Sequence, residues 1–272
     1  MTSRIYNVKV ERLPEEKLTY KLFSATTLPA KIDLRSKMPP VYDQGNLGSC
    51  TANALAAIFQ YDAPTFMGSR LFLYYNERML EYSTSYDAGA TLSSGITCLK
   101  KYGICSETTW PYTISAFKTK PPTKCYTTAL ANRVITATNI QNTAAAMKAS
   151  LAANEPFVIG FLVYASFESY AVSKTGVVPM PKAGERVLGG HAVVVCGYDD
   201  AKQWWIVRNS WGTRWGDKGY FYVPYAYFLN RNLCSDLWNI TSIITPKVLP
   251  KAVEPSPYSS ILSRIESSKC RL

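Results

Sequence analysis

The sequence predicts an α+β fold, with helices mainly in the first half of the chain and strands in the second. Alanine-rich and amphipathic segments with helical spacing come first, and short apolar and aromatic runs bounded by turn residues follow. The chain has 272 residues, of which 47% are hydrophobic and 18% charged, so it can bury a substantial core. This segregation of helices and strands predicts two lobes with a cleft between them.

The first helix is predicted to start after Ser49, a candidate N-cap, and to end before Pro64. Further helices are predicted at residues 70–81, 92–102 and 142–154. Residues 111–128 are rich in proline, threonine and lysine, and we expect a loop there. Strands are predicted at residues 157–163, 191–195, 204–207 and 219–223.

The two ends of the chain differ from this central part. Residues 1–29 are mixed and polar, which predicts an arm or a short pro-segment. Residues 247–272 are rich in proline and serine and are expected to form an extension outside the core. The N-terminus lacks an apolar signal-peptide core. The number of cysteines, seven, is odd, so at least one cannot pair within the chain. An intracellular location or packaging in a particle is therefore favoured over classical secretion.

Composition argues against several classes of protein. The net charge is +11, but lysine and arginine are dispersed, so nucleic-acid binding is not expected. No run of about 18 apolar residues occurs, so no transmembrane helix is expected. The single histidine excludes a zinc site built on several histidines, and we expect neither a metal nor a cofactor.

Cys50 is the candidate nucleophile. It stands at the start of the first predicted helix, where the helix dipole and unpaired backbone N–H groups favour the reactive thiolate. Gly45 and Gly48 precede it and leave room for a tight turn and for a substrate. An isolated cysteine is more often a buried structural thiol, so its role depends on the motifs around it.

His191 and Asn209 are the candidate partners of this thiol. His191 follows two glycines at the start of an apolar strand, 141 residues after Cys50. Because the chain has one histidine, any mechanism with a nucleophile and a histidine base must use it. Asn209 begins the run Asn-Ser-Trp-Gly, which is followed by further Trp-Gly and Gly-Tyr pairs.

These three runs resemble the active-site signatures of the papain family of cysteine peptidases. The resemblance implies that Cys50 is the nucleophile, that His191 shuttles protons and that Asn209 orients its ring. Gln44, six residues before the cysteine, matches the family's oxyanion glutamine. Trp211 would shield the bond between histidine and asparagine from water.

The sequence departs from the family pattern at two positions. Leu47 replaces a cysteine of a structural disulfide, and Thr51 replaces the aromatic residue after the nucleophile. Together with residues 69–76 and 102–112, these features are similar to the microbial and large-virus branch rather than to lysosomal cathepsins.

The resemblance spans about residues 28–245 and implies a two-lobed papain-like fold. We expect a catalytic domain at residues 30–246. Its helical lobe is expected at about 42–135 and its antiparallel, β-barrel-like lobe at about 136–246, with the active site in the cleft between them.

The implied activity is that of a cysteine endopeptidase, which cleaves peptide or protein substrates through an acyl-enzyme. With one histidine there is no second one to bind a peptide C-terminus, which favours endopeptidase action. The candidate substrate contacts are Gly189, Gly190, Ala192 and Trp211. Amide ligation on the same triad and a non-catalytic papain-like binding protein are the alternatives.

Residues 1–29 contain no cysteine, so they cannot mask Cys50 covalently. As a pro-segment they would block the cleft non-covalently and be cleaved between about residues 24 and 33. Cys98 and Cys105 are a candidate pair across a helix end, although most cysteines are expected to be buried thiols. Cys270 is a candidate for an intermolecular disulfide.

Overall fold

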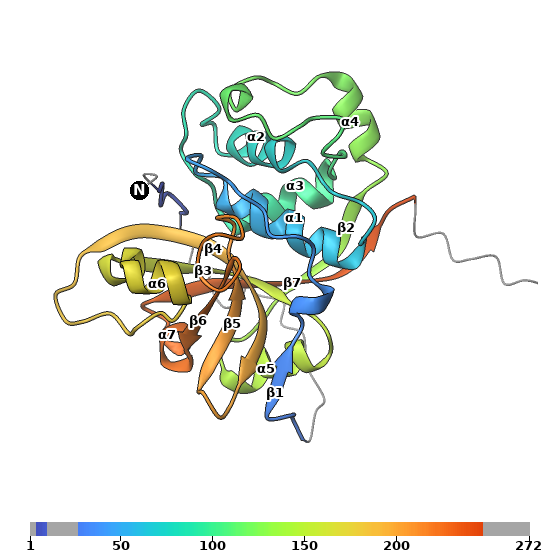
Figure 1. Cartoon of the computed structure of the whole chain (residues 1–272). Coiled ribbons are helices and arrows are strands. Elements are labelled where there is room, and N and C mark those ends of the chain that lie inside the picture. Colours follow the sequence, from blue (N-terminus) through green and yellow to red (C-terminus); the bar gives the residue numbers. More distant parts are fainter. Residues whose placement is uncertain (1–3, 10–26, 247–272) are drawn as a thin grey trace, which may run out of the picture.

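The computed structural model describes residues 4–9 and 27–246. Figure 1 shows one group of helices, α1 to α4, above a sheet that carries the remaining helices. The helices are α1 (Cys50–Asp62), α2 (Arg70–Leu80), α3 (Leu92–Lys101), α4 (Thr123–Ala129), α5 (Ala144–Ala152), α6 (Tyr170–Thr175) and α7 (Tyr225–Leu229). Short 3-10 turns occupy Arg35–Lys37, Ile114–Ala116 and Ala165–Glu168.

The sheet is antiparallel and has the strand order β2-β7-β3-β4-β5-β6, with β1 added beside β4. The strands are β1 (Lys31–Asp33), β2 (Arg133–Asn139), β3 (Phe157–Tyr164), β4 (Val187–Asp199), β5 (Trp204–Arg208), β6 (Tyr220–Pro224) and β7 (Cys234–Ile244). The central strand β3 is an almost continuous apolar run because it is buried on both faces. The predicted α+β class, with helices on one side and an antiparallel sheet on the other, is confirmed.

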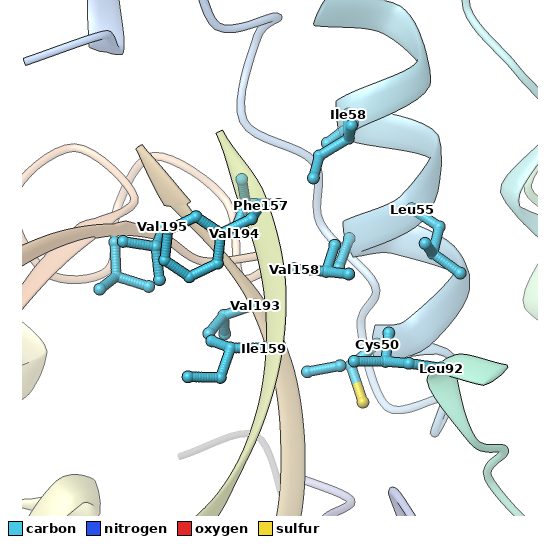
Figure 2. Close-up of a cluster of buried hydrophobic side chains, with 14 of the residues drawn as sticks. Cys50, Leu55, Ile58, Leu92, Phe157, Val158, Ile159, Val193, Val194 and Val195 are labelled. Atoms are coloured by element: carbon cyan, nitrogen blue, oxygen red, sulfur yellow. The ribbon is translucent and has the colours of Figure 1, made fainter. Parts of the chain in front are cut away.

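The core joins α1 to the sheet. Ten of the thirteen residues of α1 are buried, so this helix is apolar on nearly all sides rather than amphipathic. Figure 2 shows Val158 pointing from β3 toward α1 and Ile58 pointing from α1 toward the sheet. Cys50 lies in the first turn of the same helix, with its sulfur directed away from Ile58. The packing of α1 on β3 and β4 therefore fixes the position of the thiol.

Two sequence predictions about local structure are wrong. Residues 111–128 are not simply a loop, because they contain a 3-10 turn and most of α4, which follows Pro122 as its N-cap residue. Cys98 and Cys105 do not pair: the six described cysteines, Cys50 among them, are all buried and free. The predicted extension at 247–272, with Cys270, lies outside the described residues.

Candidate active site

Cys50 is the first residue of α1 and its side chain is fully buried. Ser49 is the N-cap residue, but its hydroxyl makes no cap bond and instead meets the Tyr112 hydroxyl at 2.5 Å. Burial raises the pKa of the Cys50 thiol to about 12. A hydrogen bond from the Ala192 backbone lowers this pKa, but it only partly offsets the effect of burial. The thiol therefore lies beside the residue that follows His191, and in this arrangement it is neutral at pH 7.

His191 on β4 meets Asn209 just beyond β5. The antiparallel pairing of β4 with β5 aligns Val194 with Arg208, which brings Asn209, one residue past the end of β5, close to His191. His191 Nε2 lies 2.9 Å from Asn209 Oδ1, and the same oxygen accepts the Ser210 N–H at 2.9 Å. An amide oxygen can only accept hydrogen bonds. The Nε2 atom of His191 must therefore be the donor to Asn209 Oδ1, and it carries the ring proton. His191 Nδ1 is buried without a hydrogen-bond partner among the described residues and is the basic nitrogen.

Aromatic rings enclose this imidazole. Trp211 stacks on His191 with centroids 5.0 Å apart and an interplanar angle of 26°, and Trp215 and Phe167 pack edge-on against Trp211. Burial lowers the pKa of His191 to about 4, while the Asn209 bond opposes that shift and the Arg4 charge adds to it. The aromatic wall thus keeps water from the histidine–asparagine bond.

Gln44 is held between the two lobes and is 2% exposed. Its Oε1 accepts the Ser210 hydroxyl at 2.6 Å, and its Nε2 donates to the Leu47 carbonyl at 2.9 Å. The backbone N–H of Gln44 also donates to Ser210 O at 2.8 Å. The amide is therefore oriented with its NH₂ group toward the loop that leads to Cys50, and one N–H of that group remains for a ligand.

A buried ion pair that sequence reasoning missed supports this loop. Arg70 at the start of α2 and Glu107 meet at 2.8 Å, with side chains 9% and 16% exposed. Glu107 also accepts the backbone N–H groups of Arg70 and Tyr112. The Arg70 guanidinium lies 4.1 Å from the Tyr112 ring centroid and donates to Asn53 Oδ1. These contacts tie α1, α2 and residues 106–112 together.

The network continues to the residues around the thiol. Asn53 donates to the carbonyl and hydroxyl of Ser49, at 2.9 and 3.0 Å. The Tyr112 hydroxyl donates to the Gln44 carbonyl at 3.0 Å. Arg70 and Glu107 are separated in the sequence from Cys50 and carry no active-site motif, so no local signal marks them. Their position follows only from the packing of α1 and α2.

Residues 4–9 lie across the site, drawn in dark blue at the N label in Figure 1. The Tyr6 ring meets the His191 ring edge-on at 6.1 Å, and Arg4 lies 4.8 Å above the Trp211 ring. The Val8 N–H donates to Gly190 O at 3.2 Å, and the Lys9 N–H donates to Ala90 O at 3.2 Å. This arm, residues 4–9, thus spans from the aromatic wall to the helical lobe.

Three glycines leave space for the arm. A Cβ on Gly189 would lie 2.1 Å from Tyr6 O, and one on Gly89 would lie 1.9 Å from Asn7 O. A Cβ on Gly48, two residues before Cys50, would lie 2.2 Å from the Asn7 side chain. Gly89 and Gly189 lie against the backbone of the arm, where only glycine fits, whereas Gly48 lies against the Asn7 side chain.

The structure thus brings together most of the predicted site. His191, Asn209 and Trp211 form one cluster. Gln44 and Cys50 stand at the two ends of the loop formed by residues 45–49. Gly189 and Gly190 contact the arm, whereas Ala192 is buried behind the thiol. Cys50 makes no hydrogen bond with His191 in the described structure.

Residues 4–9 and 27–246 were compared with two other kinds of feature, a metal site and a membrane span, and contain neither. No group of three or more histidine, cysteine, aspartate or glutamate side chains there is arranged to hold a metal ion. In the same ranges, no helix combines the length and apolar character needed to span a bilayer.

Comparison with known sequences adds a family to this geometry. A family model described as papain family cysteine protease matches residues 28–235. An uncharacterized peptidase C1-like protein of Acanthamoeba polyphaga mimivirus is 45% identical over 218 residues, which is 75% of this chain and 70% of that protein. A cathepsin B-like protein of Giardia intestinalis is 31% identical over 222 residues, or 74% of this chain and 70% of that protein.

Solved structures agree with these matches. Xylellain, a cysteine protease from Xylella fastidiosa, superposes with a TM-score of 0.81 at 35% identity and covers 89% of this chain and 97% of its own. A procathepsin B from Trypanosoma congolense, at 20% identity, shares the fold with a TM-score of 0.66 over 88% of this chain and 87% of its own. The viral and bacterial matches agree with the predicted microbial and large-virus branch.

Proposed function

The chain belongs to the papain family of cysteine proteases, and we propose that it is an endopeptidase whose nucleophile is Cys50. One observation carries this assignment of the site. A peptide, the chain's own arm, lies against three glycines, of which Gly48 stands two residues before Cys50 and Gly189 two residues before His191, and it makes backbone hydrogen bonds there. A groove that accepts this backbone has the shape and the hydrogen-bond acceptors that an extended substrate needs.

In the proposed reaction, the Cys50 thiolate attacks the scissile carbonyl carbon. The Cys50 N–H and the free N–H of Gln44 stabilise the oxyanion that forms. His191, protonated at Nδ1 by the thiol, then gives this proton to the leaving amine, and an acyl-enzyme remains. His191 next takes a proton from water, which attacks the thioester, and the second product leaves as a carboxylic acid. Asn209 holds the Nε2–H throughout.

Labelling with a peptidyl epoxide tests the nucleophile and its base. We expect a single modification at Cys50, located by intact mass and peptide mapping, and its loss in the His191→Ala variant. Slow labelling scattered over several cysteines, in the full chain and in a chain that starts near Leu28, would contradict the assignment. Ligation on the same triad would instead appear as amide products when a peptide amine is added to the reaction.

We further propose that the chain as described is a latent form. The arm places the Tyr6 ring against His191, and Arg4 adds a positive charge that lowers the imidazole pKa. With the arm in place, the Cys50 thiol and the His191 imidazole are both neutral at pH 7, whereas attack on a carbonyl requires the thiolate. Loss of the arm would admit water and favour the ion pair.

Truncation tests this latency. A chain that starts near Leu28, within the predicted cleavage range of about 24–33, should be labelled at Cys50 faster than the full chain, and its labelling should begin at lower pH. Residues 10–26 of the connecting stretch lie outside the described structure. Equal rates for the full and truncated chains would exclude inhibition by the arm.

A further inference from the structure

The Lys9 side chain of the arm contacts the carboxylate of Glu81 in the helical lobe. Its backbone N–H is fixed to Ala90 O, and its ammonium meets Glu81 Oε2 at 2.5 Å. Lys9 lies two residues beyond Asn7, whose side chain lies against Gly48 near the nucleophile. The carboxylate therefore faces a subsite a short distance along the groove from Cys50.

Glu81 is held in place by its own lobe. It is the C-cap residue of α2, and its Oε1 accepts both the backbone N–H of Thr91 at 2.8 Å and the Thr91 hydroxyl at 3.2 Å. The Ser94 hydroxyl is a further donor to this carboxylate, while Oε2 faces the arm and meets Lys9. With Lys9 in contact the Glu81 side chain is 13% exposed, and the Thr91 bonds orient it from within its own lobe.

Charge favours a cation at this point. Burial opposes ionisation of Glu81, but the Lys9 ammonium, the Thr91 backbone N–H and the Ser94 hydroxyl outweigh it and lower the pKa of the carboxyl. The group is thus a carboxylate at neutral pH. A carboxylate fixed by neutral donors, with one oxygen directed into a peptide groove, discriminates strongly between a cationic and an uncharged side chain.

The ion pair between Lys31 and Asp199 shows the difference from an ordinary surface pair. The Asp199 side chain is also 13% exposed, and its Oδ2 lies 2.9 Å from Lys31 Nζ. Its two residues, however, already face each other across the pairing of β1 with β4. Lys9 and Glu81 have no such pairing between secondary-structure elements, and Lys9 approaches Glu81 only because the arm lies in the groove.

We propose that Glu81 is a specificity-determining residue that selects a lysine or arginine side chain in the subsite that Lys9 occupies. The substrate class is then peptides with a basic residue a short distance from the scissile bond. The inference rests on the proposed peptidase function and deepens it. The arm uses the same preference when it occupies the groove.

The test uses the full chain with Lys9→Met and, beside it, a chain that starts near Leu28, so that the arm's cation no longer competes. Fluorogenic peptides would carry lysine, norleucine or glutamate at each position on either side of the scissile bond. At one position we expect kcat/KM for lysine to exceed that for norleucine by about tenfold or more. Glu81→Gln should remove this preference and leave norleucine substrates within about twofold, and Glu81→Lys should favour glutamate there.

Asp199→Asn is the matched control, since it removes an equally buried carboxylate outside the groove, and it should leave the preference unchanged. A lysine preference that persists in Glu81→Gln, or no preference at any position while norleucine peptides are cleaved, would overturn this inference alone. Absence of cleavage together with absence of epoxide labelling at Cys50, in the Lys9→Met chain and in the chain that starts near Leu28, would overturn the proposed function, and this inference with it.

Discussion

The two sides of the active site are built by different means. On the sheet side, His191 and Asn209 are placed by adjacent strands and enclosed by Trp211. On the helical side, Cys50 and Gln44 lie on a helix start and a loop held by side-chain bonds that begin at Arg70. Strand register spreads its stability over many backbone bonds, whereas the side-chain network depends on single groups. The helical side should therefore be the more sensitive to mutation.

Arg70→Met should have the largest effect and would break the helical side. It leaves the mostly buried Glu107 carboxylate without its cation and held only by two backbone N–H groups, which should cost up to about 3–5 kcal/mol of the free energy of unfolding. Urea denaturation measures this loss. The double variant with Glu107→Gln should recover much of the stability but not kcat, because the link through Asn53 is still missing.

Lys148→Met is the control for this comparison. The pair between Lys148 and Asp200 is more exposed, with side chains 17% and 35% accessible, and its loss should cost about 1 kcal/mol or less. Equal destabilisation by Arg70→Met and Lys148→Met would contradict the central role of the Arg70 network.

Gln44→Ala should lower kcat by about 100- to 1,000-fold, as expected for one oxyanion donor. Ser210→Ala removes only the bond that orients the Gln44 amide and should cost about tenfold or less. Steady-state kinetics on one fluorogenic peptide measures both, on a chain truncated near Leu28. A Gln44→Ala variant with unchanged kcat would exclude the glutamine from the oxyanion hole.

Glu77→Gln should change how stability depends on pH. Glu77 is fully buried and accepts the Thr51 hydroxyl at 2.7 Å, and burial raises its pKa to about 8. The folded state favours the protonated acid, so this stabilisation is complete below the unfolded pKa of about 4.3 and is lost as the pH rises toward 8. The variant should lose roughly 1–3 kcal/mol less stability between pH 5 and pH 8. Parallel pH profiles for the two proteins would refute this.

Arg4→Gln should have the smallest effect and tests the sheet side. Removal of the Arg4 charge should raise the His191 pKa by less than about one unit, because burial is the main cause of its depression. The chain has one histidine, so a single NMR resonance reports the titration. Arg35→Gln, whose guanidinium pairs with Asp33, should leave that resonance unchanged. A shift with Arg35→Gln as large as that with Arg4→Gln would exclude a local effect.

The sequence predicted the parts of the fold with strong local signals. Helices α1, α2, α3 and α5 and strands β3 to β6 appear within a few residues of their predicted ends. Three other strands were missed, because β1 has three residues and β2 and β7 pair with bulges that interrupt their alternation. Helix α4 was missed because residues 111–128 are rich in proline, threonine and lysine, although Pro122 stands at the N-cap position, where it does not interrupt the helix.

The candidate site divides in the same way. Cys50, His191, Asn209 and Gln44 could be named from motifs and spacing, whereas Arg70 and Glu107 could not. The ion pair between Arg70 at a helix start and Glu107 in a loop is formed by three-dimensional packing. No motif or regular spacing in the sequence connects the two residues. The arm's contacts were equally hidden, because Lys9 and Glu81 are 72 residues apart.

The three glycines that contact the arm impose a shared constraint. If the arm blocks the groove as proposed, any side chain at Gly48, Gly89 or Gly189 that expels it would also obstruct a substrate, so point substitutions there would not release the enzyme cleanly. Covalent connection offers another means of control. While joined to the chain, the arm competes at a high effective concentration, which can reach about the millimolar range. A single cut in the connecting stretch turns it into a dilute free peptide, so even a weakly bound arm would give a sharp and irreversible switch.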